Sequence, residues 1–336
     1  MQSITGEYVV KDNYHDIYLH NIEKHMKDYT FSNQPRGFKQ QERLFTAFTL
    51  LNPVDRICYH EVRRINIVFL FAEVLWYLKG DNSLDFIAYY CPAMKKFSAD
   101  QKTLQGSAYG TKIFNWQGHL NQWQCICDEL KKDPDSKRAV IHIRDPIEMM
   151  YRNNIDATCT LTLQFLIREG RLIMITSMRA NDMYRGAVSD VFSFTFIHEL
   201  MSRQLGLEPG SYHHQVGSTH IYEPDYEKAK ALLASKKERQ HYSFMFPLMP
   251  EGDNWKHIDR VLEYEEQLRH NRLSLDMREI NLCGLPEYWL QVVLLFDIYR
   301  EITFERKING EKYGLLNPLY RYLMGNRHDE SELHRG

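Results

Sequence analysis

The stretch Thr160–Met178 reads TLTLQFLIREGRLIMITSM, and its pattern of apolar and polar residues decides the fold. In its first half every second residue is apolar, so four side chains share one face of a strand: Leu161, Leu163, Phe165 and Ile167. Residues 168–171 (REGR) include a glycine suited to a turn. A second apolar segment, Leu172–Met178, follows the turn. The stretch therefore predicts a β-hairpin.

Helices are predicted on both sides of this hairpin. Apolar residues at helical spacing predict a buried helix over residues 61–79, which Gly80 ends. An amphipathic helix is expected over residues 119–132. After the hairpin, we expect a long helix that begins at an N-cap, Ser189, and stops at Gly206.

Shorter strands are expected at Arg138–Arg144 and His214–Tyr222. Residues 1–30 look like a peripheral helix followed by a connection, and the last ten residues are polar, so we expect them to fray. No repeat or linker interrupts the alternation of helices and strands. The pattern indicates one α/β (α+β) domain over residues 1–336.

The composition argues against several classes of protein. The formal net charge is −2, so we expect no nucleic-acid partner, and a phosphate group must be bound by a few local arginines. No apolar run approaches the roughly 18 residues that span a bilayer, and the first residues lack a signal-peptide pattern. A cytoplasmic protein with no membrane partner is expected. Cys125 and Cys127 lie in a helical stretch where they point to different faces, which argues against a metal or redox pair.

Cys159, at the mouth of the hairpin, is the first candidate for chemistry. A lone cysteine near a strand start is more often structural than reactive. However, the hairpin brings Cys159 close to the strand end that carries Arg179 and Asp182, and a nearby guanidinium lowers a thiol pKa. His220 and Tyr222 follow further along the chain. A phosphate-binding arginine would therefore also prepare a nucleophile.

Six separated segments resemble motifs of the thymidylate synthase superfamily and occur in the same order. They are AEVLWYLKGD (72–81), AYG (108–110), DPDSKR (133–138), ATCTLTLQF (157–165), MRANDMYRG (178–186) and VGSTHIY (216–222). The resemblance covers roughly residues 30–225. It implies a large mixed β-sheet flanked by helices, with the sheet packing across a homodimer interface and active sites shared between subunits. It also implies a divergent helical C-terminal region over about residues 226–336.

The resemblance implies a covalent mechanism with a reduced folate. Cys159 corresponds to the nucleophile that adds to C6 of a pyrimidine nucleotide, which lets C5 attack the methylene carbon of 5,10-methylenetetrahydrofolate. Glu73 corresponds to the glutamate that organises water and proton transfer near the base. Tyr109 lies where the family places a second acid/base hydroxyl. Asp182 corresponds to the aspartate that orients the folate pterin.

The resemblance also assigns ligands for the phosphate. Arg179 corresponds to a phosphate ligand from its own subunit. Lys137 and Arg138 lie where the family supplies two arginines across the dimer interface; by themselves they would be ordinary surface charges. Arg36, in the segment QPRGF, is a weaker match to an arginine of a mobile loop.

His220 and Tyr222 correspond to the pair that hydrogen-bonds the 3′-hydroxyl of the sugar. The histidines at 213, 214 and 220 could suggest a metal, but no companion residue has ligand spacing. We therefore expect no metal cofactor.

Asp190 is the most informative departure from the family pattern. Thymidylate synthases have an asparagine here, whose amide pairs with O4 and N3–H of uracil. A carboxylate accepts from the N4 amino group of cytosine and, when protonated, donates to N3. Asp190 therefore favours cytosine. The alternative is that it only stabilises the N-terminal turn of the following helix.

A second group of departures concerns the product. The loop Pro92–Ala99 carries Met94 and Phe97 where thymidylate synthases keep tryptophans over the methylene intermediate, with two lysines between them, and Thr160 replaces a histidine. Loss of that packing would admit water, and water in place of hydride gives a 5-hydroxymethyl product. These features resemble the cytidylate hydroxymethylase branch.

Two departures bear on the sugar. Ala180 replaces a serine, which leaves room for a 2′-hydroxyl, and Lys137 replaces an arginine and can donate to that hydroxyl. CMP is therefore favoured over dCMP, as in the ribonucleotide hydroxymethylases of nucleoside-antibiotic and antimetabolite pathways. The C-terminal segment lacks the short apolar ending that closes thymidylate synthase sites, so closure must occur by other means.

The hypothesis from the sequence is a homodimeric transferase that forms 5-hydroxymethyl-CMP. The alternatives are a dCMP hydroxymethylase and a thymidylate synthase that methylates dUMP. A nucleotide-binding regulator would not need to keep Cys159, Glu73 and Asp182 together. A hydrolase that pairs Cys159 with His220 would not explain the arginines or Asp190.

Overall fold

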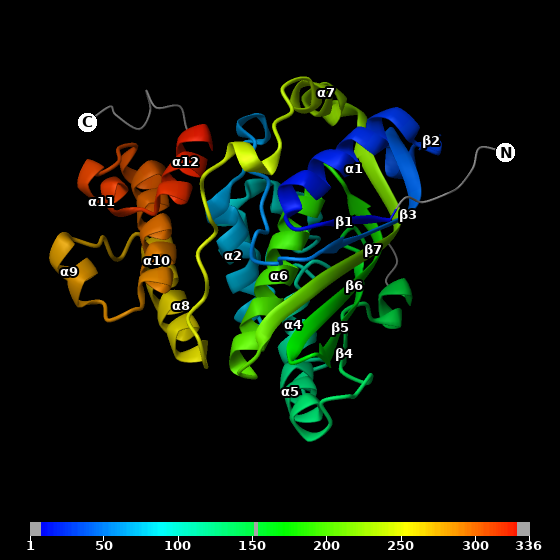
Figure 1. Ribbon diagram of the computed structural model, residues 1–336. Helices are drawn as coiled ribbons and strands as arrows, with labels where there is room; N and C mark the ends of the chain where they lie inside the picture. The colour runs from blue at the N-terminus through cyan, green and yellow to red at the C-terminus, as the bar shows by residue number, and fades with distance from the viewer. Residues whose placement is uncertain (1–7, 151–153, 328–336) are drawn as a thin grey trace.

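The centre of the structure is a mixed sheet built around the hairpin of β5 (Thr160–Arg168) and β6 (Arg171–Asp182). A computed structural model describes residues 8–150 and 154–327. Over these ranges the strand order is β1-β3-β7-β6-β5-β4, with β2 paired to β3 (Figure 1). The other strands are β1 (Val9–Lys11), β2 (Phe31–Asn33), β3 (Gln40–Leu50), β4 (Val140–His142) and β7 (Glu208–Tyr222).

The sheet has both parallel and antiparallel pairs. β6 pairs in parallel with β7, and β1 with β3, whereas β3–β7, β5–β6, β4–β5 and β2–β3 are antiparallel. The prediction of a large mixed sheet is therefore confirmed. β7 is longer than predicted, because it pairs with both β3 and β6 along its length and so begins at Glu208.

The hairpin forms as predicted, except at its first residues. Thr160 lies opposite Met178 and Thr162 opposite Ser177, so the strand contains a bulge at Leu161. As a result Thr160 is fully buried while Leu161 is only half-buried. The predicted alternation is wrong at Leu161, and the bulge lies two residues after Cys159.

Helix α2 (Ile67–Leu78) begins later than the sequence pattern predicts. Residues Glu61–Arg63 form a separate 3-10 turn, η2, and Arg64 ends it with a positive φ of 50°. The side chain of Asn66 then accepts from the amide of Phe69 and caps α2. Local capping, which apolar spacing does not reveal, therefore sets the start of the helix.

Helix α6 (Gly186–Gln204) begins three residues before the predicted N-cap, so that assignment of Ser189 is wrong. Asp182 accepts from the amides of Tyr184 and Arg185 and turns the chain directly from β6 into the helix. The end is as predicted, with Gly206 at a φ of 69°.

Helices cover one face of the sheet. α2 and α6 pack together in the middle of the molecule, with α6 against β6 and β7, and α1 packs on β3 (Figure 1). The predicted amphipathic helix is α5 (Gln122–Lys132), which begins three residues later than predicted; on it Cys125 is exposed and Cys127 buried, as expected from their spacing. The remaining helices of this part are α1 (Tyr14–Asp28), α3 (Leu84–Tyr90), α4 (Tyr109–Phe114), α5 (Gln122–Lys132) and α7 (Tyr226–Ala234).

The C-terminal helices lie on the side of α2 that faces away from the sheet (Figure 1). Both α10 and α12 contact α2, and α10 packs on α8. Their bounds are α8 (Trp255–Arg269), α9 (Met277–Leu282), α10 (Glu287–Arg300), α11 (Gly310–Leu315) and α12 (Pro318–Arg327). The division of the chain into one domain stays a prediction, and the expected fraying of the last ten residues falls almost wholly outside the described ranges.

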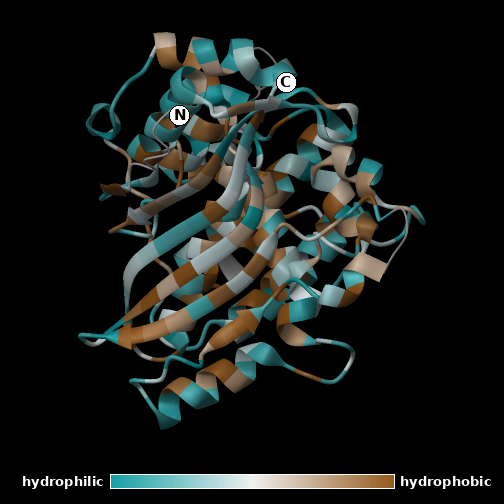
Figure 2. Cartoon of the chain, turned by 90° about the vertical axis from the view of Figure 1, so that its right-hand side faces the viewer, coloured by the Kyte–Doolittle hydropathy of each residue, from teal (hydrophilic) through white to brown (hydrophobic). Residues whose placement is uncertain are grey.

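The opposite face of the sheet is open in the single chain. Figure 2 looks onto this face, and no helix crosses in front of the central strands. Its side chains are half-buried and mix apolar with polar character, for example Ile173, Ile175 and Ser177 on β6. Whether a second copy covers this face stays a prediction.

Gly110 allows α4 to approach α2, and this contact is open to a test of stability. A Cβ at Gly110 would lie 2.0 Å from the carbonyl oxygen of Tyr77, so Gly110→Ala forces the two helices apart. We expect it to lower the free energy of unfolding by about 1–3 kcal/mol, measured by urea denaturation.

The matched control is Gly314→Ala in α11, where a Cβ meets nothing within 4 Å. Alanine there should raise stability by up to about 1 kcal/mol through helix propensity. Equal stabilities for the two variants would contradict the close approach.

Candidate active site

Cys159 and Arg179 meet at the open end of the hairpin, as the sequence predicts. The amide of Arg179 donates to the carbonyl of Cys159 at 2.9 Å, and Nη2 of Arg179 lies 3.6 Å from the thiol sulfur. The same guanidinium donates to the carbonyls of Thr158 (2.8 Å) and Ala157 (2.9 Å). One arginine therefore holds both the thiol and the backbone that carries it.

Burial, however, outweighs Arg179 in setting the protonation of the thiol. Burial raises the pKa of Cys159, Arg179 and Arg36 oppose the rise, and the carboxylates of Asp190 and Asp156 add to it. The effect of Arg179 has the predicted sign, but the net pKa lies above that of a free cysteine. The thiol is therefore protonated at neutral pH, and its proton must be removed before attack.

Two buried carboxyl groups from different helices belong to the same site. Burial raises the pKa of Glu73 to about 8, the charge of Asp190 adds to this, and Ser193 Oγ, at 3.3 Å, opposes it. Burial likewise raises the pKa of Asp190 to about 7, opposed by a 3.0 Å hydrogen bond from Asn181 Nδ2, while Asp182 adds to the rise. Carboxyl groups that titrate near neutrality can both give and take protons.

Tyr109 extends from α4 toward these groups. Its ring stacks on Tyr77 with centroids 5.0 Å apart. Burial raises its pKa well above 10, with the charges of Asp190 and Cys159 adding to the effect. The hydroxyl therefore keeps its proton and can act as a hydrogen-bond donor near the thiol.

The sugar and folate candidates lie on neighbouring strands. Asp182 on β6 is opposite His220 on β7, and the amide of Met183 donates to the His220 carbonyl at 2.8 Å. The rings of His220 and Tyr222 meet edge to face at 4.8 Å. Burial lowers the pKa of His220 to about 4, so its imidazole is neutral. Ala180 is half-buried and lies opposite Ser218.

Arg36 reaches this neighbourhood from η1 (Pro35–Gly37), where it has a positive φ of 54°. Burial and the charge of Asp182 raise the pKa of Tyr222, and Arg36 opposes the rise. Arg36 also lies close enough to influence the pKa of Cys159 and His220. The weaker of the motif matches thus lies within electrostatic range of the thiol.

Lys137 and Arg138 lie elsewhere in the chain. Val140 of β4 pairs with Gln164 of β5, so Arg138, two residues earlier, lies level with Leu166. Leu166 follows Cys159 by seven residues along the strand, which places Arg138 roughly 20 Å from Cys159. Its side chain is 77% exposed and pairs with Glu129 of α5. A side chain does not bridge that distance, so neither residue serves the Cys159 of its own chain.

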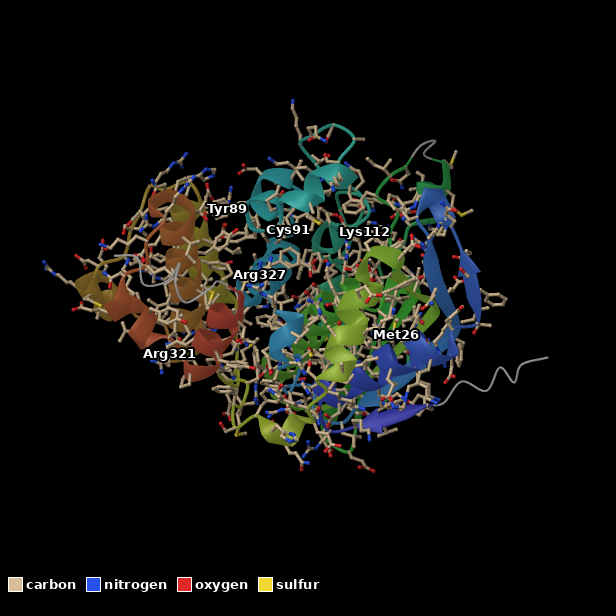
Figure 3. The ribbon with its side chains drawn as sticks, turned by 90° about the horizontal axis from the view of Figure 1, so that it is seen from above. Met26, Tyr89, Cys91, Lys112, Arg321 and Arg327 are labelled. Carbon is tan, nitrogen blue, oxygen red and sulfur yellow. The ribbon has the colours of Figure 1, made fainter. Side chains whose placement is uncertain are left out.

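The loop expected to cover the folate forms η3 (Pro92–Phe97). Met94 packs against the core, whereas Phe97 is 42% exposed. Cys91, just before η3, lies near both Glu73 and Arg327: burial raises its pKa, the charge of Glu73 adds to this and that of Arg327 opposes it. Figure 3 labels Cys91 and Arg327, and the end of α12 thus approaches η3.

Sequence reasoning missed two residues that contact the carboxyl groups. Asn181 donates to Asp190, and Ser193 donates to Glu73. Ser193 follows Asp190 by three residues in α6, so helical spacing alone could have placed both on one face. Asn181 carried no such signal, because β6 and α6 must both be in place before it meets Asp190.

A family model described as "Thymidylate synthase" matches residues 16–260. The chain belongs to the thymidylate synthase family. It is 30% identical over 267 residues to a "Deoxyuridylate hydroxymethyltransferase" of Bacillus phage SP01, covering 76% of this chain and 66% of the relative. It is 32% identical over 186 residues to a protein of the same description from Pseudomonas phage M6, covering 54% and 52%. The chain thus spans less than two thirds of each relative.

Two features of the described residues concern the membrane and the metal. No helix within residues 8–150 or 154–327 is long and apolar enough to cross a membrane. In the same ranges no group of three His, Cys, Asp or Glu side chains is arranged to hold a metal ion. A cytoplasmic location stays a prediction.

If Cys159 is the nucleophile, Cys159→Ala should lower turnover by at least about a thousandfold, because no covalent activation of C5 remains. Nucleotide binding should change little, since Arg179 and His220 remain. Release of tritium from C5-labelled nucleotide measures activation, and calorimetry measures binding. Cys125→Ala removes an exposed cysteine and should be active. Tritium release by Cys159→Ala would contradict the mechanism.

The buried carboxyl of Glu73 should make stability depend on pH. Its pKa is about 8 in the folded chain and near 4.5 when unfolded, so between these values only the folded state keeps the proton. The protein should therefore lose stability as pH rises from about 5 to 8. Glu73→Gln should flatten this decline in Tm, whereas Glu227→Gln, on the exposed surface, should not. An unchanged slope in Glu73→Gln would contradict the assignment.

Proposed function

We propose that this protein transfers a one-carbon unit from 5,10-methylenetetrahydrofolate to C5 of a pyrimidine nucleoside monophosphate and forms the 5-hydroxymethyl nucleotide. Membership of the thymidylate synthase family supports the folate and the nucleotide. The descriptions of the two phage relatives support hydroxymethylation in place of methylation. The clustering of Cys159, Arg179, Glu73 and Asp190 supports a covalent route.

The residues divide the chemistry between them. Cys159 Sγ adds to C6 and shifts electron density to C5, which then forms a bond to the methylene carbon that the folate supplies. Loss of the C5 proton and departure of tetrahydrofolate leave an exocyclic methylene on the base. Glu73, with a pKa near 8, positions the water that adds to it, after which the C6–S bond breaks. In the overall reaction, the nucleotide, methylenetetrahydrofolate and water give the hydroxymethyl nucleotide and tetrahydrofolate.

The carboxylate of Asp182 can accept hydrogen bonds from a reduced folate. Asp182 uses one oxygen, Oδ1, for the amides of Tyr184 and Arg185. Oδ2 accepts from no protein donor among the described residues, so it is free for the amino and ring N–H groups of a pterin. Burial raises the pKa of Asp182 to about 6, which still leaves it ionised at neutral pH.

The proposed choice of base rests on the hydrogen bond between Asn181 and Asp190. Asn181 Nδ2 is 3.0 Å from Asp190 Oδ2 and fixes the orientation of the carboxyl group. An ionised Asp190 accepts from N4 of cytosine and repels O4 of uracil. We therefore propose a cytidine nucleotide, with CMP favoured over dCMP because Ala180 leaves room beside the sugar.

A uracil nucleotide is the second candidate, and two observations favour it. Both relatives are described as acting on deoxyuridylate. In addition, Asp190 with a pKa of about 7 is partly protonated, and a protonated carboxyl can donate to O4 and accept from N3–H. The protonated form therefore fits uracil as well as cytosine, to whose N3 it donates.

A second copy of the chain is part of the proposal. Lys137 and Arg138 lie too far from Cys159 to bind the same nucleotide, so their family role requires a partner whose open sheet face meets this one. The wider role in nucleoside-antibiotic or antimetabolite biosynthesis rests on the choice of ribose, and it stays a proposal with it.

One experiment tests the reaction directly. The protein is incubated with labelled methylenetetrahydrofolate and, separately, CMP, dCMP, UMP and dUMP, and the products are identified by mass. We expect a nucleotide that gains 30 mass units, that is CH2O, as follows from the balance above, and no absorbance change from dihydrofolate. A gain of a methyl group together with dihydrofolate would overturn hydroxymethylation.

Asp190→Asn tests the choice of base. An amide cannot be ionised and can pair with uracil, so kcat/KM for CMP should fall by about tenfold or more and that for a uracil nucleotide should rise. Asp259→Asn, an exposed change on α8, is the control and should alter neither. If Asp190→Asn keeps the wild-type ratio of CMP to uracil nucleotide at pH 6 and pH 8, Asp190 does not read the base.

A further inference from the structure

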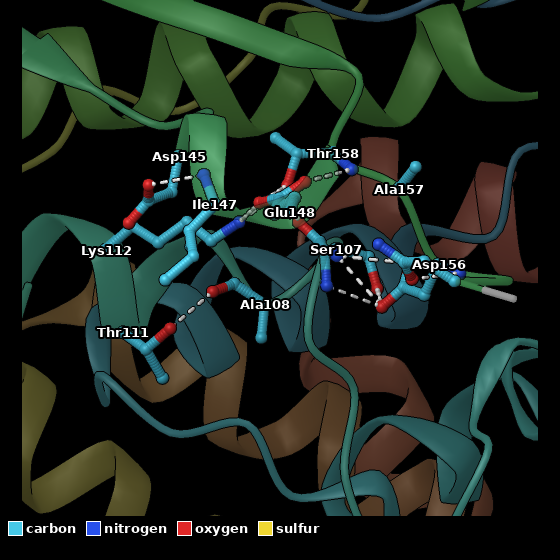
Figure 4. Close-up of polar contacts among 12 residues, drawn as sticks. Ser107, Ala108, Thr111, Lys112, Asp145, Ile147, Glu148, Asp156, Ala157 and Thr158 are labelled. Atoms are coloured by element: carbon cyan, nitrogen blue, oxygen red, sulfur yellow. Dashed lines mark hydrogen bonds and ion pairs between the residues drawn. The ribbon is translucent and has the colours of Figure 1, made fainter. Parts of the chain in front are cut away.

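The three residues before Cys159 are held from both sides. On one side Arg179 donates to the carbonyls of Ala157 and Thr158. On the other, the Asp156 carboxylate accepts from the amides of Gly106 (2.8 Å) and Ser107 (3.0 Å) (Figure 4). The thiol therefore follows a segment in which the Asp156 carboxylate and the carbonyls of Ala157 and Thr158 are all hydrogen-bonded.

A buried ion pair holds Thr158, the residue next to the thiol. Lys112 of α4 pairs with Glu148 of η4 (Pro146–Met150), and their side chains are 13% and 7% exposed. Glu148 Oε2 accepts the amide of Thr158 at 3.1 Å, and Lys112 Nζ lies 2.5 Å from the Thr158 hydroxyl (Figure 4). That hydroxyl is also 2.6 Å from Glu148 Oε1 and 2.8 Å from the Gly106 carbonyl, which share its proton.

We propose that Lys112 and Glu148 are positioning residues that fix Thr158 and thereby hold the Cys159 thiol against Arg179. The inference rests on the proposed role of Cys159 as the nucleophile. The chain of contacts is short: the ion pair holds the amide and hydroxyl of Thr158, and Arg179 holds its carbonyl and touches Sγ at 3.6 Å. Displacement of Thr158 would therefore move Arg179 relative to the sulfur.

Because Lys112 and Glu148 are both charged, comparison of single and double variants can distinguish their role from that of an uncharged packing contact. Burial alone would raise the pKa of Glu148, but the bonds from Lys112 and Thr158 hold it below its ordinary value. Removal of Lys112 alone leaves a buried carboxylate without its cation, which is costlier than removal of both charges. Glutamine at 148 still accepts from the Thr158 amide. The double variant Lys112→Met with Glu148→Gln should therefore recover part of what Lys112→Met loses.

The readout is the titration of the thiol, because Arg179 lowers its pKa. The groups that face Cys159 come from several elements: Arg179 (β6), Arg36 (η1), Asp190 (α6), Asp156 in its own segment, Tyr109 (α4) and Tyr222 (β7). Lys112 and Glu148 are not among the main direct influences on this thiol. A change at either residue can thus alter its titration chiefly by moving the groups that do act on it.

The experiment measures the rate of alkylation of Cys159 by iodoacetamide against pH in the full chain, with the modified cysteine identified by peptide mass. In Thr158→Val and Lys112→Met the midpoint should rise by about half a unit or more. Turnover should fall by about tenfold. Thr158→Ser, which keeps the hydroxyl, and the double variant should return toward wild type. Lys236→Met breaks an exposed ion pair with Glu23 and should change nothing.

Thr158→Val differs from the wild type only by replacement of a hydroxyl with a methyl group, so it provides a folded test even if Lys112→Met melts. A wild-type midpoint in Thr158→Val overturns the positioning role, whatever its Tm. Equal damage in Lys112→Met and the double variant overturns the role of the ion pair. If Cys159→Ala itself keeps turnover, the proposed function fails, while the alkylation result still reports on the position of the thiol.

Discussion

The guanidinium of Arg179 connects the sheet to the site. Its strand neighbour across the hairpin is Cys159, and its side chain folds back to bind the two carbonyls that precede the thiol. Such an arrangement is possible only because β5 and β6 are antiparallel and in a fixed register up to the bulge at Leu161. The bulge shifts the register by one residue, so Thr160, opposite Met178, enters the core while Cys159, opposite Arg179, does not. Cys159 and Arg179 thus define the centre of the site at the open end of the hairpin.

Burial of ionisable groups away from water dominates the electrostatics of the site around Cys159 and Arg179. Glu73, Asp190 and the thiol all have raised pKa values, and in each case burial is the largest cause. The three groups therefore favour their protonated forms, and each charge that appears makes the next one harder to form. A nucleotide phosphate near Arg179 would compete with the sulfur for the same cation. In the proposed reaction, the thiol proton therefore has to pass to the ionised form of one of these carboxyl groups before Cys159 attacks.

Local sequence patterns predicted the parts of the fold that local physics decides. The hairpin, the amphipathic helix and the stop at Gly206 follow from period and glycine conformation, and they were right apart from the bulge at Leu161 and the first residues of the helix. The starts of α2 and α6 were wrong because Asn66 and Asp182 cap or turn the chain through contacts that periodicity does not report. The motifs brought Cys159, Arg179 and Asp190 together correctly, but not Asn181, Ser193 or the pair of Lys112 and Glu148. These partners lie on other elements: Lys112 and Glu148 are 36 residues apart, and Ser193 and Glu73 are 120 apart. Only the completed packing joins them.

Helix α2, which carries Glu73, has an apolar residue at nearly every position and is buried on all sides. Its inner side meets α6, but its outer side meets α10 and α12, which lie beyond residue 260, where the match to the family ends. These C-terminal helices therefore cover the apolar outer side of α2. Without them, the apolar outer side of α2 would meet water, and the carboxyl of Glu73 would lose part of the burial that raises its pKa.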